Sequence, residues 1–172
     1  HPMDWLSIGI HTLGMYDTTG QWRNDALNLV ARMPRLMGLI FRYREGRESD
    51  IPEDDVTKSL VTRFVDTLDI SGVDKEKMTK VVSTYLVLHM DHGGGNLSTF
   101  TGKSIASGKA TVYSAIAGAM NALSGPLHGR ANQSCLEFVL KVGTSDEVEV
   151  EKFVRKELAE GRPVFGFGHA AV

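Results

Sequence analysis

The chain has 172 residues, of which 42% are hydrophobic, and its 19 Lys and Arg against 21 Asp and Glu give a formal net charge of −2. This content suffices for one compact domain, or for one large domain and part of a second, and it excludes a disordered tail. The balanced charge provides no basic surface for nucleic acid or an anionic membrane, and no apolar run approaches the roughly 20 residues of a membrane-spanning helix.

Apolar residues recur at helical spacing through most of the chain and predict an all-α fold. The first stripe, Ala26 to Ile40, contains Pro34 and predicts a helix that kinks or starts afresh there. A second stripe runs from Val56 to Leu68 and a third from Met78 to Leu88. The polar segment 42–55 between the first two stripes is expected to form a surface loop.

The second half of the chain predicts three more elements. Residues from about Thr99 to Leu123 are rich in Ala, Ser and Gly and predict one long, central helix, because small side chains let helices approach closely. A new helix is then expected with Pro126 in its first turn and its end near Val142. Ser145-Asp146 is expected to cap a last helix, which Gly161 ends.

Three histidine-bearing clusters depart from a plain helical bundle, and the first spans residues 88–96. A helix runs out there into three glycines, which let backbone approach a ligand closely, beside His92 and Asn96. An ordinary glycine-terminated helix is the alternative. A metal site is a second alternative, since His89, Asp91 and His92 are possible ligands. We expect no metal, because no cysteine lies nearby and the histidines lack the spacing that marks a zinc protease.

The second cluster, residues 125–133, places His128 in the first turn of the predicted helix. Unpaired backbone amides and the positive end of the helix dipole disfavour a second positive charge there. A neutral imidazole in that place can donate a hydrogen bond to a carbonyl, as one does in an enzyme that forms an enolate. The alternative is an ordinary surface histidine at a helix start.

The third cluster, residues 161–169, alternates glycine with bulky side chains and cannot form a regular helix. Such a segment can wrap a flat group and offer it backbone amides and carbonyls. An ordinary packed connection is the alternative, because a lone glycine-rich loop is a weak signal.

In this order the three clusters resemble the signature of the citrate synthase family. His92 and Asn96 match its oxaloacetate-binding histidine and a nearby asparagine of the site, although Gly93 stands where many members have glutamate. His128 matches the histidine of the Gly-Pro-Leu-His-Gly motif, and His169 that of the Gly-x-Gly-His motif.

The resemblance implies an all-α, citrate-synthase-like fold. Residues 1–124 would form part of the large helical domain and residues 125–172 the beginning of the small domain. The remainder of both domains is expected beyond Val172, and the complete protein would be a homodimer. Its location would be cytoplasmic, with the mitochondrial matrix as the alternative. The single cysteine, Cys135, cannot form an internal disulfide, which suits a reducing compartment and also an oxidising one without bridges.

The function implied is that of a transferase of the tricarboxylic acid cycle, which joins acetyl-CoA to oxaloacetate through an enol or enolate and citryl-CoA. His128 would donate a hydrogen bond to the thioester oxygen, His169 would polarise the ketone of oxaloacetate, and His92 and Asn96 would bind that substrate. The adenine of CoA would be held by backbone around Val164, Gly166, Phe167 and Gly168.

Acetyl-CoA is a substrate in this scheme, and no prosthetic group is expected. The aspartate that removes the methyl proton lies downstream of the Gly-x-Gly-His motif in the family, so the 172 residues alone are expected to be inactive. Two alternatives remain. One is a 2-methylcitrate synthase that uses propionyl-CoA, since one methylene is worth only about 1–3 kcal/mol in a pocket. The other is a non-catalytic helical binding module.

Overall fold

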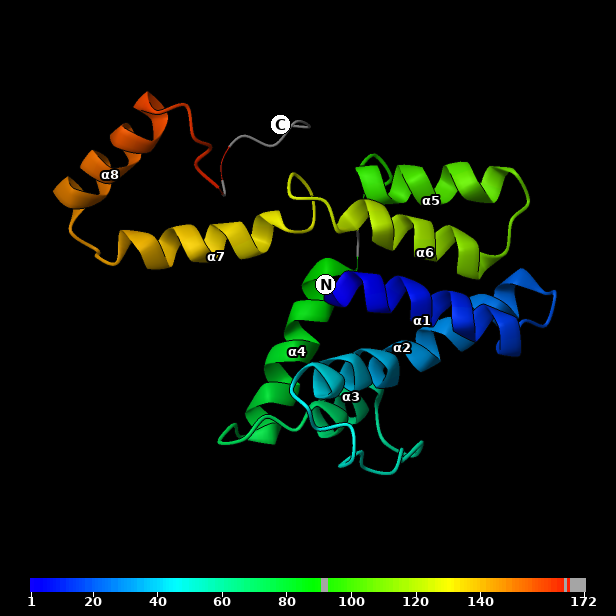
Figure 1. Cartoon of the computed structure of the whole chain (residues 1–172). Coiled ribbons are helices and arrows are strands. Elements are labelled where there is room, and N and C mark those ends of the chain that lie inside the picture. The colour runs from blue at the N-terminus through cyan, green and yellow to red at the C-terminus, as the bar shows by residue number, and fades with distance from the viewer. Residues whose placement is uncertain (91–92, 166, 168–172) are drawn as a thin grey trace. The chain divides into compact units, whose positions relative to one another are not determined.

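A computed structural model describes residues 1–90, 93–165 and 167 (Figure 1). These residues form eight α-helices and no strand, so the all-α prediction is confirmed. The chain divides into two compact units, residues 1–122 and 123–172. None of the helices in the described ranges combines the length and apolar character that a bilayer crossing requires.

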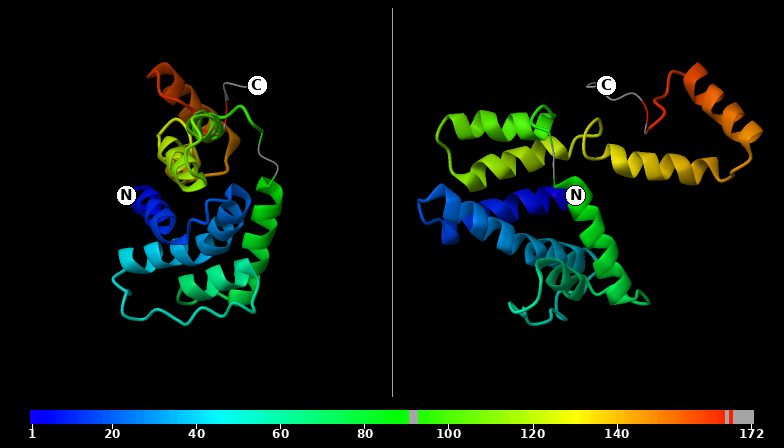
Figure 2. Two further views of the ribbon diagram at one scale, coloured as in Figure 1. Left: turned by 90° about the vertical axis from the view of Figure 1, so that its right-hand side faces the viewer. Right: turned by 180° about the vertical axis from the view of Figure 1, so that it is seen from behind.

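The first unit holds six helices. They are α1 (Pro2–Asp17), α2 (Trp22–Arg44), α3 (Leu60–Leu68), α4 (Lys75–His89), α5 (Leu97–Ser107) and α6 (Val112–Leu123), of which α6 ends one residue beyond the unit. Helix α2 packs against α1 and α3, and α3 packs against α4 (Figures 1 and 2). Helices α5 and α6 form an antiparallel pair, in which Gly102 and Gly118 allow close approach.

The core of this unit joins α1, α2 and α6. Its buried members are Leu6, Ile10, Leu29, Tyr113 and Ala117. Two of them lie on α6, so this part of the small-residue stretch is central, as the sequence predicted. On α5, by contrast, the one buried residue is Ser98.

The prediction of one long helix from Thr99 to Leu123 is wrong. Helix α5 ends at Ser107, and Lys109 has a φ of 60°, which the interior of a right-handed helix does not accommodate. The hydroxyl of Thr111 then accepts the Ser114 amide at 3.2 Å and caps α6. The chain therefore folds back instead of continuing straight.

The sequence also placed the end of α2 too early. The helix does not start afresh at Pro34 and runs on to Arg44. Packing of α2 against α1 and α3 outweighs the local cost of an internal proline, about 3 kcal/mol. Arg42, expected on a surface loop, lies in the last turn of the helix with only 2% of its surface exposed.

A glycine in the left-handed region ends α2. Gly46 has a φ of 68°, and its amide bonds to the Tyr43 carbonyl at 3.1 Å. The Arg47 amide bonds to the Arg42 carbonyl at 2.9 Å. These two bonds satisfy carbonyls that the helix end leaves open and turn the chain sharply into the loop that follows.

The second unit contains α7 (Ala131–Val142) and α8 (Glu147–Ala159). The rings of Phe138 and Phe153 pack edge to face with centroids 5.6 Å apart. The Asp146 carboxylate accepts the Glu149 amide at 3.0 Å, so the cap predicted at Ser145-Asp146 is confirmed and Asp146 provides it. Gly161, with a φ of 69°, follows the last turn of α8, as predicted.

A buried carboxylate anchors the segment after α8. Glu157 accepts two hydrogen bonds from the Arg162 guanidinium, each of 2.7 Å, and one from Lys141 at 3.3 Å. Hydrogen bonding to Arg162, supported by that to Lys141, lowers the pKa of Glu157 from 4.5 to about 2. This cluster holds the start of the third histidine-bearing segment against α7 and α8.

This pair predicts an acid-sensitive contribution to stability. Because the folded-state pKa of Glu157 is depressed, its contribution is complete above about pH 4.5 and is lost as the pH falls towards 2. Thermal midpoints of the wild type and Glu157→Gln should therefore differ most at neutral pH and converge near pH 2. Glu151→Gln, which removes an exposed carboxylate on the same helix, is the control. A constant difference across this range would contradict the prediction.

Candidate active site

The first predicted cluster lies where α4 ends and α5 begins. His89 is the last residue of α4, and its ring stacks on Tyr85 with centroids 3.9 Å apart. Its Nδ1 atom lies 2.7 Å from the Tyr85 carbonyl oxygen, so Nδ1 carries the proton and donates. His92 lies outside the described residues, and its role stays a prediction.

Asn96 shapes the loop after the glycines. Its Oδ1 atom accepts the Thr99 amide at 2.9 Å and the Ser98 hydroxyl at 2.7 Å, so it caps α5. Its Nδ2 atom donates to the Gly93 carbonyl at 2.9 Å and closes the turn. The sequence analysis assigned Asn96 to substrate binding and missed its role as the cap of α5, although asparagine is a common helix cap.

His128 lies in a turn of the second unit. The predicted helix start at Pro126 is wrong, because residues 124–130 form turns and α7 begins at Ala131. The His128 amide bonds to the Gly125 carbonyl at 3.1 Å, and its own carbonyl accepts the Ala131 amide at 3.1 Å. His128 is half-buried and leads directly into α7.

Gly129 makes this turn possible. Its amide bonds to the Leu123 carbonyl at 2.9 Å, at the end of α6. A Cβ atom at position 129 would lie 2.3 Å from that oxygen and 2.7 Å from the Leu123 side chain. Only glycine fits, because the backbone oxygen cannot rotate away.

Gly129→Ala is therefore expected to displace the turn that carries His128. We expect a destabilisation of roughly 1–3 kcal/mol from overpacking, together with a loss of any activity that depends on His128. Denaturant unfolding measures the first effect. Gly143→Ala is the control for close packing, because an added Cβ meets no atom closer than 3.6 Å there. Since Gly143 has a φ of 68°, we expect this variant to lose stability through backbone strain alone. Equal losses of activity in both variants would contradict the assignment.

The third cluster forms a turn after α8. The Phe167 amide bonds to the Val164 carbonyl at 3.4 Å, and Phe167 itself is 82% exposed. The Phe165 carbonyl lies 3.7 Å from the Cys135 sulfur of α7 and accepts its weak hydrogen bond. The structure thus brings Val164 and Phe167 together in one turn. Gly166, Gly168 and His169 lie outside the described residues.

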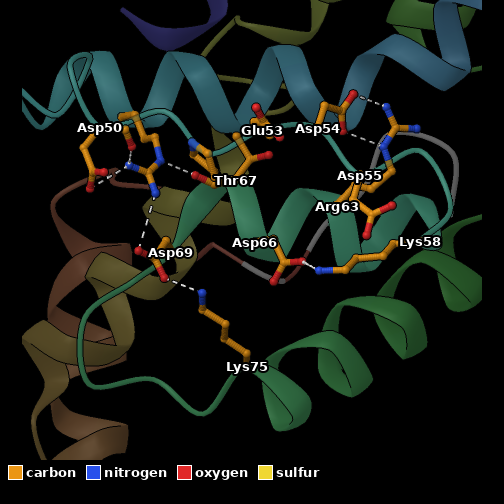
Figure 3. A pocket seen from close by; sticks show the side chains of 12 residues that line it. Asp50, Glu53, Asp54, Asp55, Lys58, Arg63, Asp66, Thr67, Asp69 and Lys75 are labelled. Carbon is orange, nitrogen blue, oxygen red and sulfur yellow. Dashed lines mark hydrogen bonds and ion pairs between the residues drawn. The ribbon is translucent and has the colours of Figure 1, made fainter.

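A charged cavity of about 320 Å³ is an alternative to these clusters as a ligand site (Figure 3). It lies between the loop after α2 and helices α3 and α4. Each basic residue that lines it has an acidic partner within the cavity wall: Arg42 with Asp50 and Asp69, Lys58 with Asp66, Arg63 with Asp54, and Lys75 with Asp69.

These contacts define a structural network. Hydrogen bonding to Lys75 lowers the pKa of Asp69, and hydrogen bonding to Arg63 lowers that of Asp54, so both carboxylates stay ionised. These ion pairs engage all four basic side chains of the lining and tie the loop to α3 and α4. Within the described residues, no group of three or more His, Cys, Asp or Glu side chains is arranged to hold a metal ion.

Known proteins share this helical arrangement. The structure of citrate synthase from Thermoplasma acidophilum shares the fold with a TM-score of 0.78 and 24% identity, over 98% of this chain and 44% of that one. The sequence profile "Citrate synthase, C-terminal domain" matches residues 1–172. The chain therefore belongs to the citrate synthase family, as its three motifs predicted.

Two relatives illustrate the range within the family. Peroxisomal citrate synthase of Saccharomyces cerevisiae is 34% identical over 86% of this chain and 32% of its own length. Mitochondrial 2-methylcitrate synthase of Yarrowia lipolytica is 32% identical over 100% of this chain and 41% of its own length. The chain thus spans about a third to two fifths of these relatives.

Proposed function

We propose that this chain is the central part of an enzyme that condenses acetyl-CoA with oxaloacetate to give citrate and CoA. The observation that carries the proposal is the family match over the whole chain, with histidines in all three motifs. The Thermoplasma acidophilum protein, which has the same fold, was solved as a ternary complex with carboxymethyl coenzyme A and oxaloacetate.

In this proposal His128 acts on the thioester. A neutral imidazole donates a hydrogen bond to the thioester oxygen, where negative charge develops as a carboxylate removes the methyl proton. Because the family's catalytic aspartate lies downstream of the Gly-x-Gly-His motif, we place that carboxylate beyond residue 172. His169 polarises the ketone of oxaloacetate, and the new carbon–carbon bond gives citryl-CoA, which water then hydrolyses.

The remaining residues bind the substrates. His92 and Asn96 hold oxaloacetate, and Asn96 does so from the loop that it also folds. The adenine of CoA lies on the backbone of Val164, Gly166, Phe167 and Gly168. We assign residues 1–124 to the large domain and 125–172 to the small domain of a homodimer, located in the cytoplasm or the mitochondrial matrix.

A spectrophotometric assay of CoA release by the full-length protein tests this function. We expect release from acetyl-CoA only when oxaloacetate is present. The 172-residue chain alone should release none, because loss of a general base costs about 100- to 10,000-fold in rate. Turnover by a monodisperse preparation of residues 1–172 would overturn the placement of the base. Oxaloacetate binding without CoA release by the full-length protein would favour a non-catalytic module.

The second candidate is condensation of propionyl-CoA, favoured by the match of the Yarrowia lipolytica 2-methylcitrate synthase to the whole chain. One added methylene changes binding by about 1–3 kcal/mol, so the two activities differ by roughly 10- to 200-fold in kcat/KM. Comparing kcat/KM for the two thioesters in the same preparation decides between them.

A further inference from the structure

Arg162 fastens the segment that follows α8 to a buried carboxylate. Its Nε and Nη2 atoms donate to the two carboxylate oxygens of Glu157 at 2.7 Å each, and the Glu157 side chain is only 6% exposed. The Arg162 amide also bonds to the Glu157 carbonyl at 2.9 Å. Two parallel bonds to one carboxylate fix a guanidinium in direction as well as in position. The backbone and the side chain of Arg162 are therefore held by the same residue of α8.

The same carboxylate also engages α7. Lys141 of α7 donates to Glu157 at 3.3 Å, and its Nζ atom lies 5.3 Å from the centroid of the Phe153 ring of α8. The pKa of Glu157, about 2, keeps this carboxylate ionised throughout the neutral range. One buried charge thus joins both helices of the second unit to the segment after them.

The chain after Arg162 carries this constraint to Val164. The ring of Pro163 fixes φ at about −65°. Arg162 precedes this proline, which restricts its own backbone largely to extended conformations. Little conformational freedom therefore remains between the anchored guanidinium and Val164, whose carbonyl accepts the Phe167 amide at 3.4 Å in the turn.

A second, weaker contact ties this segment to α7. The Cys135 thiol donates to the Phe165 carbonyl at 3.7 Å. Because a thiol is a weak donor, the ion pair at Arg162 supplies the stronger tie. The backbone from Arg162 to Phe165 is consequently held at both ends, while the Phe167 side chain is 82% exposed.

We propose that Arg162, held by Glu157, is a positioning residue for the adenine of acetyl-CoA. The pair sets the backbone of Val164 in advance, and a segment that is ordered before binding loses less conformational entropy when the ligand arrives. Arg162 acts through this backbone and not on the reacting atoms. This inference rests on the proposed function, which assigns the adenine to the backbone of Val164 and of residues that follow it.

Steady-state kinetics of the full-length protein test the proposal. Arg162→Met is expected to raise KM for acetyl-CoA by about 3- to 10-fold, while kcat and KM for oxaloacetate change less than about twofold. Arg162→Lys keeps the charge but loses the forked geometry, so its KM should lie between those of Arg162→Met and the wild type. An unchanged KM for acetyl-CoA in Arg162→Met would overturn the inference.

The exposed pair of Arg155 and Glu151 on α8 provides the matched control. Arg155 donates to Glu151 at 2.8 Å, but the two side chains are 75% and 62% exposed. Arg155→Met should leave all three kinetic parameters unchanged. In a double-mutant cycle, Glu157→Gln and Arg162→Met together should raise KM for acetyl-CoA no further than the more impaired single variant, because both remove one contact. Additive effects would show that the two residues do not act as a pair.

A thioester without adenine distinguishes positioning from a general loss of structure. Acetyl-pantetheine carries the same acetyl thioester but no nucleotide, so Arg162→Met and the wild type should use it with kcat/KM values within about twofold of each other. An equal loss with both thioesters would give Arg162 a purely structural role and overturn the inference. If Arg162→Met does not fold, Arg162→Lys and Glu157→Gln provide the same comparison.

Calorimetric titration with CoA separates this inference from the proposed function. The wild type should bind CoA about 3- to 10-fold more tightly than Arg162→Met. Equal affinities overturn the inference, whatever the protein turns over. A wild type that binds CoA but releases none from acetyl-CoA and oxaloacetate would instead refute the condensation reaction, and one that binds no CoA would refute both.

Discussion

Replacing His128 with alanine in the full-length protein is expected to lower kcat for condensation by about 100- to 10,000-fold, with little change in oxaloacetate affinity. The imidazole should stabilise negative charge that develops on the thioester oxygen only as the proton leaves acetyl-CoA. Its loss therefore raises the barrier of the chemical step and leaves ground-state binding of the other substrate intact.

Steady-state kinetics and calorimetry with oxaloacetate measure these two quantities separately. His11→Ala is a matched control, because His11 is an exposed histidine on α1 and should leave both unchanged. The Gly129→Ala variant should also lower turnover, since it displaces the turn that carries the imidazole without removing the imidazole. A His128→Ala protein that turns over normally and binds oxaloacetate poorly would reverse the assignment.

Arg42→Met is expected to destabilise the first unit by roughly 2–4 kcal/mol. The buried guanidinium donates to the backbone carbonyls of Thr67 and Asp50 and pairs with Asp69 at 3.4 Å. Methionine fills a similar volume but leaves these carbonyls without a donor. The Asp69 carboxylate is 41% exposed and can regain water, so the main loss comes from the backbone groups and not from the unpaired charge.

Chemical denaturation, followed by tryptophan fluorescence, measures this change. Arg44→Met, an exposed arginine in the same helical turn, is the control and should alter stability by no more than about 0.5 kcal/mol. Arg42→Lys keeps the charge but loses the forked geometry, so it should lie between the two. Equal effects at positions 42 and 44 would show that the network around Arg42 does not stabilise the loop.

The sequence by itself determined features that depend on neighbouring residues. The periodic apolar stripes predicted helices, and Asp146 and Gly161 marked the limits of α8, because caps act on amides and carbonyls within one turn. The order of the three histidine motifs identified the family, which the profile match confirms. The roles of His92, His128 and His169 within it stay predictions.

Only the tertiary structure decided where a helix continues and which polar side chains are buried. Pro34 predicted a kink or a fresh start, yet packing on α1 and α3 keeps α2 continuous as far as Arg44. Arg42 looked like a loop residue because its partners, Thr67 and Asp69, lie 25 and 27 positions away. Local patterns carry no record of such distant contacts, whose free energies exceed those of local propensity.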